Sequence, residues 1–143
     1  VNTMAAKHLY GGPIIIIDMG TATTFDTLSS TGEYLGGAIS PGIHIASEAL
    51  FQKASKLPRV DLFRPPEVVI GKDTAGSIQA GIIFGYAGLV DGMVRRMADE
   101  MGGTPKVIAT GGLAPLMKNV AASIEEVDNT LTLEGLRIIS NSL

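Results

Sequence analysis

The residues best suited to chemistry are concentrated in one short segment. Four branched aliphatic residues lead into a carboxylate, a glycine and three threonines in the stretch IIIIDMGTATTF, residues 14–25. A continuous β-branched run favours a strand that is covered on both faces, so the carboxylate at its end would lie where the sheet opens to ligand. Gly20 permits a sharp backbone turn. The segment therefore predicts a turn that handles a nucleotide.

Hydroxyl and backbone N–H groups of this turn could surround a phosphate or a hydrated cation. The alternative is a plain hairpin, in which the Asp and Thr side chains only satisfy the turn. Two carboxylates compete for a ligand role: Asp18 borders the glycine, whereas Asp26 lies in the body of the next strand, which favours Asp18. The hydroxyls are those of Thr21, Thr23 and Thr24.

Hydrophobic patterning and turn residues predict the elements that must hold this turn. Residues 55–72 contain three prolines and scattered charges, so they are expected to be mostly extended loop. Strands are expected at residues 13–18, 24–29, 33–39, 107–109 and 124–128. Helices are expected at residues 1–11, from 42 to about 53, 74–101, 113–122 and from about 132.

Composition narrows the class of protein. The 143 residues suit one domain, and 45% hydrophobic content is ample for a core. With a net charge of −3, the chain lacks the positive electrostatic potential that attracts nucleic acid, so nucleic-acid binding is disfavoured. The absence of cysteine rules out disulfides and Cys-ligated metal and is compatible with a cytoplasmic location. We expect no stretch to reach the roughly 20 apolar residues of a membrane span.

Two further features follow along the chain. Gly36-Gly37 and Gly42 flank a strand-to-helix passage, where a helix N-terminus exposes unpaired N–H groups toward a ligand. The alternative is packing, because adjacent glycines in a strand also mark a bulge or a close backbone approach. Thr74 opens a long helix, and it could N-cap that helix without any ligand.

Taken in order, four segments resemble the C-terminal half of a type III pantothenate kinase. Their order and spacing both match, and the resemblance covers essentially the whole chain. The family belongs to the actin-like kinases, in which ATP lies in a cleft between two related domains. The resemblance implies an α/β, ribonuclease H-like domain with three antiparallel strands followed by helices and parallel strands. The segments are DMGTATT (18–24), YLGGAISPG (34–42), IGKDT (70–74) and TGG (110–112).

The resemblance also implies an activity and its ligands. The activity is ATP-dependent phosphorylation of pantothenate to 4′-phosphopantothenate, the first step toward coenzyme A, by direct in-line transfer. Asp18 would bind a monovalent cation, potassium or ammonium, beside the triphosphate of ATP, which arrives with Mg²⁺. Contacts to ATP would come from Gly20, Thr21, Thr23, Thr110, Gly111 and Gly112, and contacts to pantothenate from Thr74, Gly37 and Gly42.

Two motifs of the family lie outside these residues. They are an N-terminal D-x-G-N-T phosphate motif and a G-x-D-R motif whose Asp is the general base. Residues 1–11 resemble the helix that directly follows G-x-D-R, so the catalytic Asp is expected just upstream of Val1. We therefore expect residues 1–12 to be the remnant of an inter-domain helix and residues 13–143 to be the C-terminal domain, with the N-terminal half missing.

Glycines recur along one face of the long predicted helix. Each interior helical glycine costs roughly 0.5–1 kcal/mol relative to alanine, so a stripe of them indicates that another backbone approaches closely. The partner could be a helix of the same domain, but the dimeric habit of the family favours a homodimer. The stripe consists of Gly81, Gly85, Gly88 and Gly92.

Two other functions were weighed. An actin-like nucleotide-binding protein that serves as a transcription accessory factor would share the fold but lack kinase turnover. A sugar or acetate kinase of the same superfamily is disfavoured, because the segments around Gly36–Gly42 and Thr74 fit pantothenate kinases better. Neither histidine, His8 or His44, has a partner at metal-ligand spacing, so neither is expected to bind metal or to act in catalysis.

Overall fold

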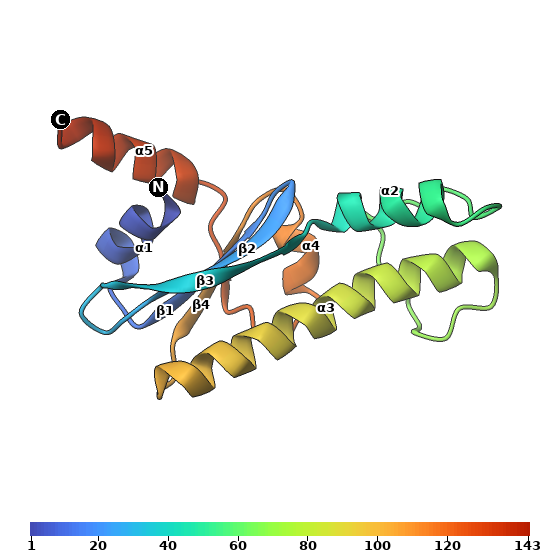
Figure 1. The fold of residues 1–143 in the computed structure, drawn as a ribbon, viewed down its shortest axis with the longest axis horizontal. Helices are drawn as coiled ribbons and strands as arrows, with labels where there is room; N and C mark the ends of the chain where they lie inside the picture. Colours follow the sequence, from blue (N-terminus) through green and yellow to red (C-terminus); the bar gives the residue numbers. More distant parts are fainter.

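The aliphatic run forms the central strand of a five-stranded sheet (Figure 1). The computed structural model describes residues 1–143, and the strand order is β3-β2-β1-β4-β5. The first three strands are antiparallel, whereas β4 and β5 run parallel to β1. This arrangement confirms the predicted fold class. The strands are β1 (Ile14–Met19), β2 (Ala22–Leu28), β3 (Tyr34–Pro41), β4 (Lys106–Thr110) and β5 (Glu126–Val127).

Helices cover both faces of the sheet. Figure 1 shows α1 and α5 together near the two chain ends, while α3 runs along the other side and extends with α2 well beyond the sheet. The bounds of α3 agree with those predicted. The helices are α1 (Asn2–Tyr10), α2 (Ile43–Lys53), α3 (Thr74–Met101), α4 (Ala114–Lys118) and α5 (Leu131–Asn141).

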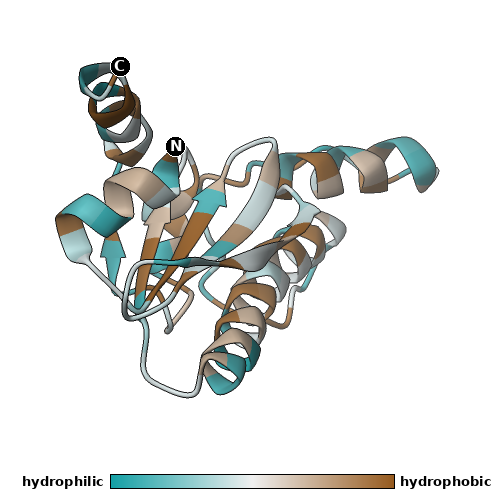
Figure 2. Ribbon diagram, turned by 60° about the vertical axis from the view of Figure 1, so that its left-hand side comes forward, coloured by the Kyte–Doolittle hydropathy of each residue, from teal (hydrophilic) through white to brown (hydrophobic).

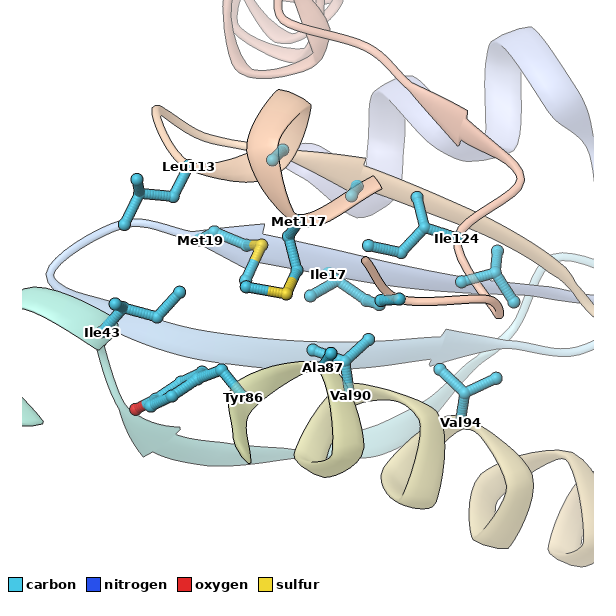
Figure 3. Close-up of a cluster of buried hydrophobic side chains, with 14 of the residues drawn as sticks. Ile17, Met19, Ile43, Tyr86, Ala87, Val90, Val94, Leu113, Met117 and Ile124 are labelled. Atoms are coloured by element: carbon cyan, nitrogen blue, oxygen red, sulfur yellow. The ribbon is translucent and has the colours of Figure 1, made fainter. Parts of the chain in front are cut away.

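Alternation along β1 creates two separate cores. Ile15, Ile17 and Met19 join the larger core, and Figure 3 shows Ile17 and Met19 lying among side chains of α3 and α4. Ile14 and Ile16 point to the opposite face and pack beneath α1 and α5. All four isoleucines are fully buried, as expected for a strand covered on both faces. Figure 2 shows the matching concentration of hydrophobic residues in the middle strands and along α3.

The strand ends differ from their predicted bounds in ways that matter for the site. β2 begins at residue 22 rather than 24, so the turn after β1 consists only of Gly20 and Thr21. β5 is shorter than the predicted span 124–128, because it pairs with β4 only at Ile108 and Ala109.

Helix α4 is also shorter than the predicted span 113–122. The carboxylate of Asp91, on α3, accepts hydrogen bonds from the backbone N–H groups of Ala122 (3.2 Å) and Ser123 (2.9 Å). It accepts a third from the Ser123 hydroxyl at 2.6 Å. These bonds hold the chain after α4 in a turn, in which the N–H groups bond a side chain instead of continuing the helix.

Helix α3 is long and apolar enough to cross a membrane by length and composition alone, which corrects the expectation that no stretch would qualify. Its apolar side chains Ile83, Val90 and Val94 pack onto the sheet as part of the larger core. Of the apolar window in α3, 33% is buried in this way. Length and composition by themselves do not distinguish a helix of a water-exposed domain from a membrane span.

Helix α5 is fastened at its start by Asp128. The carboxylate accepts hydrogen bonds from the backbone N–H and the hydroxyl of Thr130, both at 2.9 Å, and from the Tyr10 hydroxyl on α1 at 2.9 Å. Burial alone would raise the pKa of Asp128, but these hydrogen bonds outweigh it and hold the pKa below its usual value. The contact ties the end of α1 to the start of α5.

The N-cap of α3 is Asp73 rather than Thr74, which corrects the sequence-based assignment. The Asp73 carboxylate accepts a hydrogen bond of 2.6 Å from the backbone N–H of Gly76, whereas no cap hydrogen bond comes from Thr74. An aspartate is the stronger choice, because its charge also complements the positive end of the helix dipole.

Replacing Asp73 should therefore destabilise the protein. We expect Asp73→Ala to lower the free energy of unfolding by about 1 kcal/mol, because the Gly76 N–H in the first turn of the helix loses its acceptor. Thr74→Ala is the matched control and should change it by less than about 0.5 kcal/mol. Urea denaturation followed by circular dichroism measures both values, and an equal loss in the two variants would contradict this assignment of the cap.

Candidate active site

Asp18 lies near the end of β1, on the face shared with Ile16 and covered by α1 and α5. Its Oδ2 atom accepts a hydrogen bond of 2.7 Å from Nδ2 of Asn2, the first residue of α1. The other carboxylate oxygen, Oδ1, lies beside the turn, since a Cβ atom built on Gly20 would be 3.6 Å from it. One oxygen of Asp18 is thus held by the protein, and the other faces the turn.

A cavity of about 420 Å³ opens in front of Asp18, and we name it the Asp18 pocket. Asp26 lines the same pocket, and its Oδ1 atom accepts a hydrogen bond of 2.9 Å from the Tyr34 hydroxyl. The two carboxylates weighed as alternatives are therefore neighbours on one face of the sheet. The pocket is lined by Val1, Asn2, Thr3, Asp18, Thr24, Asp26, Tyr34 and Thr132.

A second cavity, of about 360 Å³, lies at the turn itself, and we name it the Gly20 pocket. It brings together Gly20, Thr21 and Gly112, three of the residues predicted to contact ATP. His44 and Phe63, which sequence reasoning did not place here, form part of its wall, with ring centroids 5.9 Å apart. The pocket is lined by Met19, Gly20, Thr21, His44, Ile45, Phe63, Gly112 and Leu113.

Glycines from two junctions pack closely against the end of β1 and the turn that follows it. Gly111 has a φ of +101°, and a Cβ atom on it would lie 2.6 Å from the carbonyl oxygen of Met19. A Cβ atom on Gly42 would overlap the carbonyl oxygen of Thr21. Only glycine fits at either position. Close packing against the turn therefore accounts for Gly42, one of the two readings that its sequence context left open.

Two predicted ATP contacts lie elsewhere than the turn. Thr23 belongs to β2, is 1% exposed and lies on the same face as Phe25, and its hydroxyl has no hydrogen-bond partner. Thr110, at the end of β4, is 3% exposed and pairs with Asp18 in the sheet. Neither residue lines the Asp18 pocket or the Gly20 pocket, whereas Thr24 lines the first of these.

The residues predicted to contact pantothenate are not gathered within this chain. Thr74 lines a cavity of about 600 Å³ between the end of α2 and the start of α3. Gly37 lies toward the other end of α3, in a cavity that it shares with Met97 and Glu100. Gly42 lies at the turn, as described above.

Sequence reasoning missed the side chains that surround the carboxylates. Asn2, Tyr34 and Thr132 each reach the Asp18 pocket from a different element, namely α1, β3 and α5. The period-2 alternation of β2 is the one available signal, because it places Thr24 and Asp26 on the same face. No sequence signal locates Thr132 beside Asn2.

The chain was compared with known proteins. A family model described as "Type III pantothenate kinase" matches residues 1–96. A type III pantothenate kinase from Desulfatibacillum aliphaticivorans is 69% identical over 139 residues, which are 97% of this chain and 54% of that protein. One from Desulforapulum autotrophicum is 64% identical over 141 residues, which are 99% of this chain and 54% of that protein. The chain thus spans about half the length of these relatives.

Solved structures agree on the fold. A Baf family transcriptional activator from Campylobacter jejuni matches 97% of this chain and 61% of its own, with a TM-score of 0.67 and 21% sequence identity. Component A of (R)-2-hydroxyglutaryl-CoA dehydratase from Acidaminococcus fermentans matches 94% of this chain and 62% of its own, with a TM-score of 0.54 and 15% identity. At these identities the likeness concerns the fold alone.

Proposed function

The chain belongs to the type III pantothenate kinase family, and from that premise we propose that the protein containing it transfers the γ-phosphoryl group of ATP to pantothenate. The product is 4′-phosphopantothenate, on the way to coenzyme A. The observation that carries this proposal is the turn at Gly20 and Thr21, which lies between the Asp18 pocket and the Gly20 pocket. A cytoplasmic location is part of the same proposal.

The turn is suited to bind phosphate. Gly20 and Thr21 are exposed, and Gly20 has no side chain to keep an anion away from the backbone. The Gly20 N–H donates to the carbonyl oxygen of Ala22 at 3.1 Å and closes the turn. The donors left for an anion are the backbone N–H and the hydroxyl of Thr21. Hydrogen-bond donors that are already in place at the phosphoryl group stabilise its charge during in-line transfer, which is the main task of a phosphotransferase.

The ligand types around Asp18 fit a hard cation. Asp18 offers one carboxylate oxygen that its protein partner does not hold, and Asp26 and Thr24 add further oxygens to the same pocket. Oxygen ligands suit potassium, and ammonium is the nitrogen cation of similar size. When bound, such a cation would lower the repulsion between the carboxylates and the triphosphate. Mg²⁺ would arrive with ATP.

The general base is assigned to the half of the enzyme that precedes this chain. Val1 lines the Asp18 pocket, which supports placing an Asp just before Val1 at the same pocket. From there it would take the proton of the primary hydroxyl of pantothenate. The substrate itself is assigned to Thr74, Gly37 and Gly42, which a single copy of this chain does not bring together.

A second copy of the chain is proposed as the partner of α3. A Cβ atom built on any glycine of the stripe finds no atom within 4 Å, so the stripe does not pack inside this domain. The alternative of an internal partner helix therefore has no support within these residues. The stripe consists of Gly81, Gly85, Gly88 and Gly92.

Residues 1–143 alone should show no kinase turnover. The general base and the first phosphate motif are assigned to the other half, so this chain can hold ligands but not complete the transfer. A coupled assay for ADP with ATP, Mg²⁺, potassium and pantothenate measures the rate, and the full-length enzyme is the positive control. Sustained turnover by residues 1–143 alone would contradict the assignment of the general base to the other half. A full-length protein that binds ATP without turnover would favour the alternative function, a transcription accessory factor.

Asp18→Asn in the full-length enzyme should abolish activation by monovalent cations and leave the fold intact. The change keeps the volume of the side chain but removes its charge, so the effect is electrostatic. Initial rates against potassium and ammonium concentration measure it. Asp26→Asn is the matched variant in the same pocket. If Asp18→Asn keeps the wild-type cation dependence and Asp26→Asn loses it, the cation site belongs to Asp26.

Gly85→Leu should shift the full-length enzyme toward monomer and reduce its activity in parallel. The larger side chain would separate the two backbones that the stripe brings together. Sedimentation velocity measures the oligomeric state. Gly103→Leu is the control, because it introduces the same side chain at another open position outside α3. A folded Gly85→Leu variant that remains dimeric would place the interface elsewhere.

A further inference from the structure

Three side chains from three elements form a hydrogen-bonded line that ends at Asp18. The Thr132 hydroxyl, on α5, donates to Oδ1 of Asn2 at 2.7 Å. Asn2, on α1, donates from Nδ2 to Oδ2 of Asp18 at 2.7 Å. The amide of Asn2 thus connects the C-terminal helix with the carboxylate proposed to bind the cation.

The direction of this line follows from the chemistry of the three groups. An ionised carboxylate only accepts hydrogen bonds, so Asp18 requires the NH₂ end of the Asn2 amide. The oxygen end of that amide must then face a donor, and the Thr132 hydroxyl is that donor. Asp18 favours this orientation from one side of the amide, and the Thr132 hydroxyl adds a second preference for it from the α5 side. In the flipped orientation the amide oxygen would face the carboxylate and repel it.

The starts of α1 and α5 are held in a fixed relation, which keeps the line short. Figure 1 shows the two helices together, and a Cβ atom on Gly135 of α5 would overlap the carbonyl oxygen of Val1. Leu131, beside Thr132, is fully buried in the smaller core. The close packing of the two helices keeps the Thr132 hydroxyl within hydrogen-bond distance of Asn2.

We propose that Asn2 and Thr132 are positioning residues, which hold Oδ2 of Asp18 so that Oδ1 faces the turn and its cation. The inference rests on the proposed cation role of Asp18. It extends that role to α5, which contributes no residue to the Gly20 pocket. Removing a residue that orients a metal ligand in this way typically lowers the affinity of the site for its ion by roughly 10–100-fold.

The test is the potassium dependence of the full-length enzyme at saturating ATP and pantothenate. We expect Thr132→Val to raise the half-activating potassium concentration by roughly tenfold, with kcat at saturating potassium nearly unchanged, because the ligand is disoriented but present. Thr132→Ser should restore the wild-type value. Thr130→Val removes a hydroxyl from the same helix start, one that donates to Asp128 instead, and should leave the value unchanged.

A double-mutant cycle separates positioning from general loosening of α5. Since Thr132 is proposed to act only through Asn2, Asn2→Ala combined with Thr132→Val should be no more impaired than Asn2→Ala alone. Three results would each overturn the proposal. They are additive effects of the two substitutions, a half-activating potassium concentration that Thr132→Val leaves unchanged, and an equal rise of that concentration in Thr132→Val and Thr130→Val.

Asp18→Asn, measured in parallel, distinguishes this inference from the proposed function. If Asp18→Asn keeps full potassium dependence, Asp18 does not bind the cation. The positioning of Asp18 by Asn2 and Thr132 is then tested by crystal structures of the Thr132 variants. An Asp18 carboxylate that rotates away from Asn2 in Thr132→Val, but not in Thr132→Ser, supports the proposal. A carboxylate that stays in place in both variants overturns it.

Discussion

The burial of both faces of β1 is the constraint on which the rest of the structure depends. Each fully buried isoleucine of this strand contributes about 1.5–3 kcal/mol, and the four alternate between two cores that have no side chain in common. A shift of the strand by one residue would exchange the two faces. The register is therefore fixed, and with it the face on which Asp18 emerges, beside α1 and α5.

The same constraint explains how a turn of two residues can act as a ligand site. β1 and β2 hold Gly20 and Thr21 at the strand ends of a rigid sheet. The backbone at Gly42 packs against the turn, and the backbone at Gly111 packs against Met19, the residue just before it. The turn is also closed by the hydrogen bond from the Gly20 N–H to the carbonyl oxygen of Ala22, so the Thr21 N–H is already oriented when an anion arrives. Packing and ligand binding thus share the same glycines, and the two readings of Gly42 are not exclusive.

Local patterns predicted most of the fold. Periodicity and turn residues predict the aliphatic strand, the proline-rich loop and the long helix α3. The family resemblance implies the three antiparallel strands followed by parallel strands, but not the order of the strands in the sheet. One error occurred where a distant contact decides the outcome, because Asp91 on α3 holds the chain after α4 in a turn. The other was local: two adjacent residues could both cap α3, and the cap is Asp73 rather than Thr74. For the site, the sequence located Asp18 and the turn. Asn2 and Thr132 lie 130 residues apart, and no local pattern indicates that they meet.

Anomalous diffraction from a crystal of the full-length enzyme tests the central claim most directly. The crystal would be grown in rubidium chloride with a non-hydrolysable ATP analogue, because rubidium substitutes for potassium and scatters anomalously. The account predicts a rubidium peak in contact with Oδ1 of Asp18, and analogue phosphates bound to the backbone N–H and the hydroxyl of Thr21. A rubidium site away from Asp18, with the phosphates bound elsewhere and the turn touching only protein, would contradict it.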